Sequence, residues 1–205
     1  MASRADTFPE FSRKLQQMGG RIVICGGSGF IGSALKSRLT DAGYVVRVVS
    51  RHPKIDEISW DQLATELEEA EAVINLSGRS IACKFTDKHK QEILSSRINS
   101  TKLVAEAIEQ CTVRPRKWIN ASATGFYGDR GDEILTETSR SGSNFSAKVC
   151  IAWEDACLHS PAKTEKVVIR IGVVLSAHGG VLKKLIPLVK VGLGGAAGSG
   201  HQWLS

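Results

Sequence analysis

Four glycines within seven residues make up the segment of this sequence that is best suited to holding a ligand. Gly26-Gly27-Ser28-Gly29-Phe30-Ile31-Gly32 directly follows an apolar run at residues 22–25 and fits both Gly-x-Gly-x-x-Gly and Gly-x-x-Gly-x-x-Gly. Glycines permit a tight turn, let the backbone approach a pyrophosphate, and let a helix pack closely on the preceding strand. The helix expected from Phe30 would aim its N–H groups and positive dipole end at the phosphates. The segment therefore predicts a dinucleotide-binding loop.

The residues about 20 positions further on indicate which dinucleotide this loop accepts. A carboxylate at that place holds the ribose 2′-hydroxyl of NAD. The sequence instead has Ser50 and Arg51 after a β-branched run at residues 45–49. A guanidinium is a fork of donors that suits a 2′-phosphate, and a hydroxyl adds another donor. We predict NADP as the cofactor, with a solvated surface role for Arg51 as the alternative.

Strand and helix patterns alternate from residue 21 to about residue 175. Apolar or β-branched runs predict strands at residues 22–25, 45–49, 58–60, 72–76, 118–121 and 167–175. Helical spacing predicts helices at residues 30–42, 61–69, 88–110, 145–158 and 180–190. The alternation predicts an α/β fold, a Rossmann-type doubly wound parallel sheet with helices on both faces. Ligands of such sheets bind at the carboxyl ends of the strands, where the glycine loop lies.

The composition is that of an ordinary globular chain with a mild positive charge. The 205 residues are 42% hydrophobic and 23% charged, with a net charge of +6, which argues against disordered, collagen-like and coiled-coil classes. No apolar run approaches the roughly 18 residues of a membrane span, and the five cysteines share no CxxC spacing. We expect no metal, nucleic-acid or membrane partner and a reducing compartment, the cytoplasm or an organelle. Residues 1–20 are expected to be a flexible leader.

Further motifs follow the glycine loop in a fixed order. Asn75-Leu76-Ser77-Gly78 comes first, and Ser122-Ala123-Thr124-Gly125-Phe126-Tyr127-Gly128 second. More specific features are Ser96-Arg97, the set Phe145, Cys150, Trp153 and Glu154, and the glycine-rich tail at residues 191–203. Over about residues 21–205 the chain resembles extended short-chain dehydrogenase/reductases, and within them the atypical "epimerase family protein" branch of the NAD(P)-dependent epimerase/dehydratase family.

The resemblance implies a cofactor role for a set of residues. Leu76 and its two successors would line the adenosine side of the cleft, and Val174 would approach the nicotinamide half. Glu92 and Arg97 lie on the helix that crosses the cleft, Arg97 where typical relatives have an Asn; a plain surface role is equally open for Glu92. The complete set that is implied is Gly26, Gly29, Phe30, Ile31, Gly32, Ser50, Arg51, Leu76, Ser77, Gly78, Glu92, Arg97 and Val174.

The catalytic pair of typical relatives, Tyr-x-x-x-Lys, does not occur in these 205 residues. Tyr44 is followed four residues later by Val48, and Tyr127 by Gly131. Aligned on Glu154, the expected Tyr and Lys fall on Ser146 and Cys150, and the usual Ser or Thr falls on Ala123. The nearby polar residues Ser122, Thr124 and Tyr127 could hold or protonate a carbonyl or hydroxyl. The catalytic residues therefore stay unassigned.

The end of the sequence carries most of the net charge. After residue 160 it contains Lys163, Lys166, Arg170, Lys183, Lys184 and Lys190 against Glu165, which suits either a mouth for a small anionic substrate or a solvated basic face. We expect a nucleotide domain at residues 21–178 and the start of a largely missing substrate region at residues 179–205. Two functions remain open: an epimerase or oxidoreductase of non-standard mechanism, and a non-catalytic NADP-binding regulator or sensor. The substrate and the oligomeric state are not predicted.

Overall fold

The computed structural model describes residues 19–177, 179–195 and 200 and divides the chain into two compact units. The first unit contains Met1–Ala121 and Ala152–Val168, and the second contains Ser122–Ile151 and Ile169–Ser205. Most of the expected leader and much of the glycine-rich tail, residues 1–18, 196–199 and 201–205, lie outside the described residues. The expected boundary at residue 178 between nucleotide and substrate regions stays a prediction.

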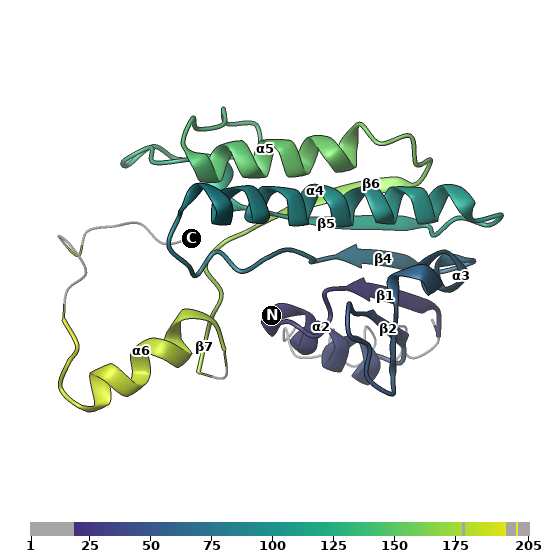
Figure 1. The fold of residues 1–205 in the computed structure, drawn as a ribbon, viewed down its shortest axis with the longest axis horizontal. Coiled ribbons are helices and arrows are strands. Elements are labelled where there is room, and N and C mark those ends of the chain that lie inside the picture. Colours follow the sequence, from purple (N-terminus) through teal and green to yellow (C-terminus); the bar gives the residue numbers. More distant parts are fainter. Residues whose placement is uncertain (1–18, 178, 196–199, 201–205) are drawn as a thin grey trace, which may run out of the picture. The chain divides into compact units, whose positions relative to one another are not determined.

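Strands and helices alternate along the chain, as the sequence predicts (Figure 1). The strands are β1 (Arg21–Cys25), β2 (Val45–Val49), β3 (Glu57–Ile58), β4 (Ala72–Asn75), β5 (Lys117–Ala123), β6 (Glu165–Ile171) and β7 (Leu175–Ser176). The α-helices are α2 (Phe30–Asp41), α3 (Leu63–Leu67), α4 (Asp87–Gln110), α5 (Phe145–Leu158) and α6 (Gly180–Lys190). Short 3-10 turns occupy Trp60–Gln62 and Thr124–Phe126.

Six strands form one sheet in the order β3-β2-β1-β4-β5-β6. β1 pairs in parallel with β2 on one side and β4 on the other, and Cys25 is in register with both Val49 and Asn75. The strand order reverses at β1, so the chain crosses to opposite sides of β1 in its two halves. This is the doubly wound topology that the alternating pattern predicts, and it puts the ends of β1, β2 and β4 at one edge.

The first unit covers both faces of the sheet with helices. Val23 and Val73 face a core that includes Val104 and Ile108 of α4. Ile22, Ile24 and Ile74 point to the opposite face, where Leu35 and Leu39 of α2 pack against them. Neighbouring residues of a strand point to opposite faces, so continuous apolar runs are what a sheet covered on both sides requires.

Three expected elements differ in the structure. The strand expected at residues 58–60 lies at Glu57–Ile58, and Trp60 begins the 3-10 turn. The strand expected at residues 167–175 ends at Ile171, and Leu175 and Ser176 instead form antiparallel bridges with Gly180 and Gly179. Ile171, Val173 and Val174 are β-branched and suit a strand, so the sequence pattern does not indicate that the strand ends before Gly172. The helix expected at residues 61–69 is a 3-10 turn followed by the five residues of α3, and the chain then turns at Glu69 with a φ of 57°.

Within the described ranges, the helices are too short or too polar to cross a membrane.

Candidate functional site

Three loops leave the sheet side by side at the carboxyl ends of β1, β2 and β4. The Gly26 N–H donates to the Val49 carbonyl at 3.3 Å, and the Leu76 N–H donates to the Cys25 carbonyl at 2.9 Å. Adjacent strands lie about 4.8 Å apart, so the first residues of these loops are immediate neighbours. The structure thus brings the glycine loop, the Ser50–Arg51 pair and the Leu76–Gly78 segment together in the first unit.

The glycine loop leaves little room for side chains at its glycine positions. A Cβ on Gly32 would lie 2.5 Å from the Gly27 Cα and 2.6 Å from the Gly26 carbonyl oxygen. Gly26 has a φ of +81°, and a Cβ there would lie 3.1 Å from the backbone of Leu76 and Ser77. These contacts give Gly32 the helix-packing role and Gly26 the turn role expected of a dinucleotide loop.

The first turn of α2 presents backbone donors at the end of this loop. Gly29 is the N-cap residue, with extended backbone, and neither a side-chain cap nor an acidic residue occupies the first turn. Phe30 and Ile31 begin the helix. The first N–H groups of a helix have no partner within the helix, and its dipole favours negative charge there. This helix end can therefore accept phosphate oxygens.

The end of β2 carries an exposed guanidinium. Ser50 is anchored through its backbone N–H, which donates to the Ile58 carbonyl at 2.9 Å, and its Oγ accepts from the His52 N–H at 3.3 Å. The Arg51 side chain makes no hydrogen bond or ion pair with any other described residue. Its donors are thus not used by the protein within the described ranges.

Helix α4 fastens the segment that follows β4. Glu92 forms an ion pair with Arg79, and Arg97 Nη1 donates to the carbonyl oxygens of Arg79 and Ile93, at 3.0 Å each. The Arg97 guanidinium also lies 5.0 Å from the centroid of the Trp153 ring. The structure therefore places both predicted residues beside the Leu76–Gly78 loop, where they contact protein groups. Their contact with a cofactor stays a prediction.

The second unit contains Val174 and the polar candidates at the end of β5. Val174 follows β6 and is 40% exposed, and Ser122 is buried at the end of β5. The Tyr127 hydroxyl accepts a hydrogen bond from Arg170 Nη1 at 2.9 Å, and the same nitrogen donates to the Glu137 carbonyl at 3.0 Å. The Arg170 guanidinium lies 3.5 Å from the centroid of the Phe126 ring. Tyr127 is thus a packed, hydrogen-bonded side chain, and the half-buried Arg170 is bound to protein groups of the second unit.

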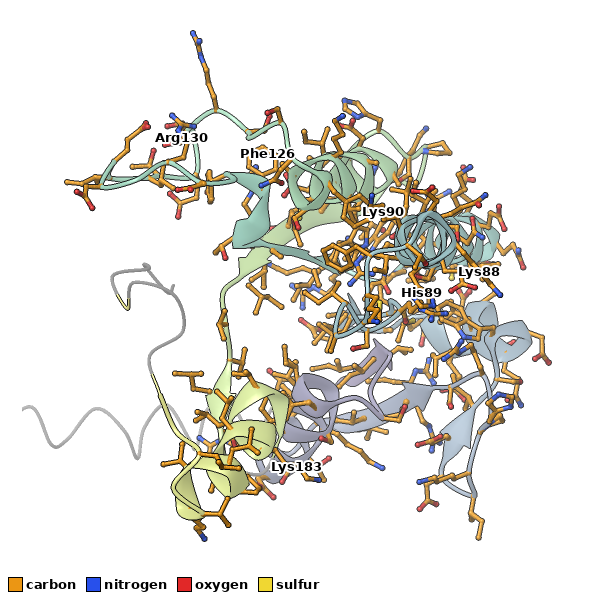
Figure 2. All side chains as sticks on the ribbon, turned by 60° about the vertical axis from the view of Figure 1, so that its left-hand side comes forward. Lys88, His89, Lys90, Phe126, Arg130 and Lys183 are labelled. Atoms are coloured by element: carbon orange, nitrogen blue, oxygen red, sulfur yellow. The ribbon has the colours of Figure 1, made fainter. Side chains whose placement is uncertain are left out.

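The loop between β5 and α5, on which Figure 2 labels Phe126 and Arg130, forms an open pocket of about 490 Å³. Arg130 is held in it by both carboxylate oxygens of Glu133 and by the Arg140 carbonyl. The pocket is lined by Gly128, Asp129, Arg130, Arg140, Ser141, Gly142, Ser143 and Asn144. Apart from Gly128, which ends the motif at residues 122–128, the lining is irregular loop, so sequence patterns do not predict this pocket.

The buried cysteines are suited to packing rather than to nucleophilic chemistry. Burial raises the pKa of the Cys25 and Cys111 thiols, and that of Cys157 to about 12. A thiol with a raised pKa stays protonated and unreactive. In the described part of the chain, no group of three or more His, Cys, Asp or Glu residues is arranged to hold a metal ion.

Comparison with known proteins agrees with this geometry. The profile of the NAD dependent epimerase/dehydratase family matches residues 22–191. Epimerase family protein Mb2239 of Mycobacterium bovis is 38% identical over 193 residues, which cover 90% of this chain and 64% of that protein.

Two solved structures have the same fold. The human epimerase family protein SDR39U1 (isoform 2), crystallised with NADPH, superposes with a TM-score of 0.83 and 34% identity, covering 90% of this chain and 64% of that one. A nucleoside-diphosphate sugar epimerase from Corynebacterium glutamicum gives a TM-score of 0.78 and 38% identity, covering 96% of this chain and 43% of that one.

These matches confirm the resemblance seen in the sequence motifs. This chain spans 64% of the length of the mycobacterial and human relatives. The match to the family profile extends from the first strand to the end of α6. The chain therefore belongs to the NAD dependent epimerase/dehydratase family, in the branch whose members are called epimerase family proteins.

Proposed function

We propose that this protein binds NADP(H) at the carboxyl edge of β1, β2 and β4. Gly26, Gly29 and Gly32 let the backbone approach the pyrophosphate, and the first turn of α2 donates N–H groups to it. Leu76, Ser77 and Gly78 line the adenosine side. Val174 would approach the nicotinamide half, a role that rests on the family resemblance alone.

The observation that carries this proposal is the register of the three strand ends. Cys25 pairs with both Val49 and Asn75. The glycine loop, the Ser50–Arg51 pair and the Leu76–Gly78 loop therefore begin at the same level of three adjacent strands. A Cβ on Gly32 would overlap the loop backbone, which keeps the start of α2 close to the strand. The residues present therefore fit a dinucleotide.

The preference for NADP rests on the charge at the end of β2. Arg51 is exposed and unpaired among the described residues, and no carboxylate stands at the position that selects NAD. Bidentate hydrogen bonds from a guanidinium to a phosphate are among the strong ones in proteins. The human relative that was crystallised with NADPH supports the same choice.

We further propose that the protein is an epimerase or oxidoreductase acting on a small polar, anionic substrate. The bound nicotinamide would supply hydride transfer, and the protein would orient the substrate and move a proton. Relatives named as epimerase family proteins and a nucleoside-diphosphate sugar epimerase support this class. The second candidate is a non-catalytic NADP-binding regulator, which the two tyrosines without a following Lys favour.

Titration of the protein with NADPH and with NADH, followed by the fluorescence of the reduced nicotinamide, tests the binding proposal. Tighter binding of NADPH supports it, and equal or tighter binding of NADH overturns the cofactor choice. Nucleoside-diphosphate sugars and other anionic metabolites are then added to the loaded protein. Conversion of any of them favours the enzyme, and lasting inertness together with a cofactor-dependent protein partner favours the regulator.

A further inference from the structure

We propose that one stripe of helix α4 is a clamp that fixes the backbone of Ser77–Arg79 before the nucleotide arrives. The α4 clamp consists of Glu92, Ser96, Arg97, Ser100 and Thr101. Glu92, Ser96 and Ser100 are four residues apart, as are Arg97 and Thr101, so the five side chains share one face of the helix. The inference rests on the proposed NADP site and deepens it: Arg97 and Thr101 act on that site as positioning residues, through the loop.

Polar groups of α4 bind the backbone at both ends of the Ser77–Arg79 segment. The Ser96 Oγ accepts from the Arg79 N–H at 2.9 Å, and Arg97 Nη1 donates to the Arg79 carbonyl at 3.0 Å. The Ser100 Oγ donates to the Ser77 carbonyl at 3.4 Å. A loop whose N–H and C=O groups are both bound to side chains has little freedom to move relative to the helix.

A buried polar chain fixes the other side of the segment. Asn75 Oδ1 accepts from the Ser77 N–H at 3.1 Å, and Asn75 Nδ2 donates to Thr101 Oγ1 at 3.1 Å and to Asn120 Oδ1 at 2.8 Å. Thr101 in turn donates to the Arg97 carbonyl at 2.8 Å and accepts from Trp153 Nε1 at 3.1 Å. Both donors of the Asn75 amide and both lone pairs of the Thr101 hydroxyl are used. A fully satisfied buried network of this kind specifies one geometry.

The Arg97 side chain packs against the loop as well as forming hydrogen bonds with it. A Cβ on Gly78 would lie 3.1–3.2 Å from three atoms of the Arg97 side chain, so the glycine permits close packing of the loop on the guanidinium. The Arg97 guanidinium also lies over the Trp153 ring, 5.0 Å from its centroid. The guanidinium is thus bound to the loop and supports it.

The clamped segment touches the glycine loop. The Cβ position of Gly26 lies 3.1 Å from the Leu76 carbonyl and from the Ser77 Cα. A shift of Ser77 therefore displaces the turn that receives the pyrophosphate. Holding the segment in one conformation reduces the ordering cost of binding, which strengthens affinity for every ligand that uses the site.

The test compares variants at helix positions outside the set proposed to contact the cofactor. Thr101→Val removes the fully buried hydroxyl at nearly constant volume, Thr101→Ser restores it, and Ser96→Ala removes the acceptor of the Arg79 N–H. Val104→Ala, on the same helix and also fully buried, is the control for general loss of packing. We measure hydrogen exchange of the Ser77 and Arg79 amides and the dissociation constants of NADPH and NADH.

We expect Thr101→Val to speed exchange of the Ser77 amide and to raise both dissociation constants by the same factor, on the order of tenfold, as loss of a buried hydrogen-bond partner implies. Thr101→Ser should restore both constants to within about twofold of the wild type. Ser96→Ala should speed exchange of the Arg79 amide, and Val104→Ala should leave exchange and affinity unchanged.

The clamp is overturned if Thr101→Val weakens binding no more than Val104→Ala does, if it weakens NADPH alone, or if Thr101→Ser fails to restore affinity. Should Thr101→Val not fold, Ser96→Ala decides the question by the same two readouts. If the wild type binds neither nucleotide, the proposed function fails. The amide exchange rates then still show whether α4 holds the segment, so the two failures are distinguishable.

Discussion

The Cα of Gly27 lies 2.5 Å from the point that a Cβ on Gly32 would occupy. Gly27 belongs to the loop after β1 and Gly32 to the first turn of α2. The contact is between backbone atoms, so no side-chain rotation can relieve an overlap. The close approach of helix and loop, on which the dinucleotide site depends, therefore requires glycine at position 32.

Gly32→Ala should destabilise the protein by about 2 kcal/mol, in the range for overpacking a tight site, and should abolish NADPH binding. Urea unfolding and NADPH titration measure the two effects. Gly19→Ala is the control, because a Cβ at Gly19 would meet nothing within 4 Å. If Gly32→Ala binds NADPH as the wild type does, the packing argument for the loop is wrong.

The pair formed by Tyr127 and Arg170 should stabilise the second unit. Tyr127→Phe removes the acceptor that Arg170 Nη1 uses at 2.9 Å, and loss of a hydrogen bond to a charged group costs about 1.5–3 kcal/mol. Tyr44→Phe is the matched control, since the Tyr44 hydroxyl has no hydrogen bond to another described residue. Thermal unfolding of the two variants is compared. Equal effects of the two substitutions would refute a stabilising role for the pair.

Buried thiols should make the protein less stable in alkali. Burial raises the pKa of Cys157 from its ordinary value of 9.0 to about 12. The folded state thus keeps a proton that the unfolded state releases, so this contribution is complete below pH 9 and is lost as the pH rises from 9 to 12. For a fully shielded thiol the limiting slope is about 1.4 kcal/mol per pH unit.

Urea unfolding of the wild type and of Cys157→Ala between pH 8 and about pH 10.5 isolates this effect from other titrations. The variant is less stable at pH 8 because it loses buried atoms, yet its stability should decline less steeply with pH. Parallel pH profiles for the two proteins would show that Cys157 does not titrate as its burial requires.

The elements that the sequence predicts best are those set by local patterns. The apolar run of β1, the four glycines and the start of α2 at Phe30 are each a property of neighbouring residues. Alternation then gives the parallel sheet, and the sheet places the ends of β1, β2 and β4 at one edge. Sequence patterns alone therefore predict that the glycine loop, Ser50–Arg51 and Leu76–Gly78 lie next to one another.

What the sequence does not reveal depends on contacts between distant residues. Arg97 reaches the backbone carbonyl of Arg79, 18 residues away, and a carbonyl has no sequence signature. Arg170 donates to Tyr127, 43 residues away, and nothing in the local sequence distinguishes this bound guanidinium from the neighbouring lysines. The composition of residues 61–69 suits a helix to Glu69, but α3 ends at Leu67 and Glu69 has a positive φ.

Selection of NADP(H) by Arg51 is tested by the ratio of the NADH and NADPH dissociation constants in the wild type and in Arg51→Ala. We expect the wild type to bind NADPH at least about tenfold more tightly. Arg51→Ala should remove that preference while NADH affinity stays unchanged, and Lys54→Ala, in the same exposed loop, should keep it. Equal affinity of the wild type for NADH and NADPH, or a preference for NADPH that survives Arg51→Ala, would show that Arg51 does not select the cofactor.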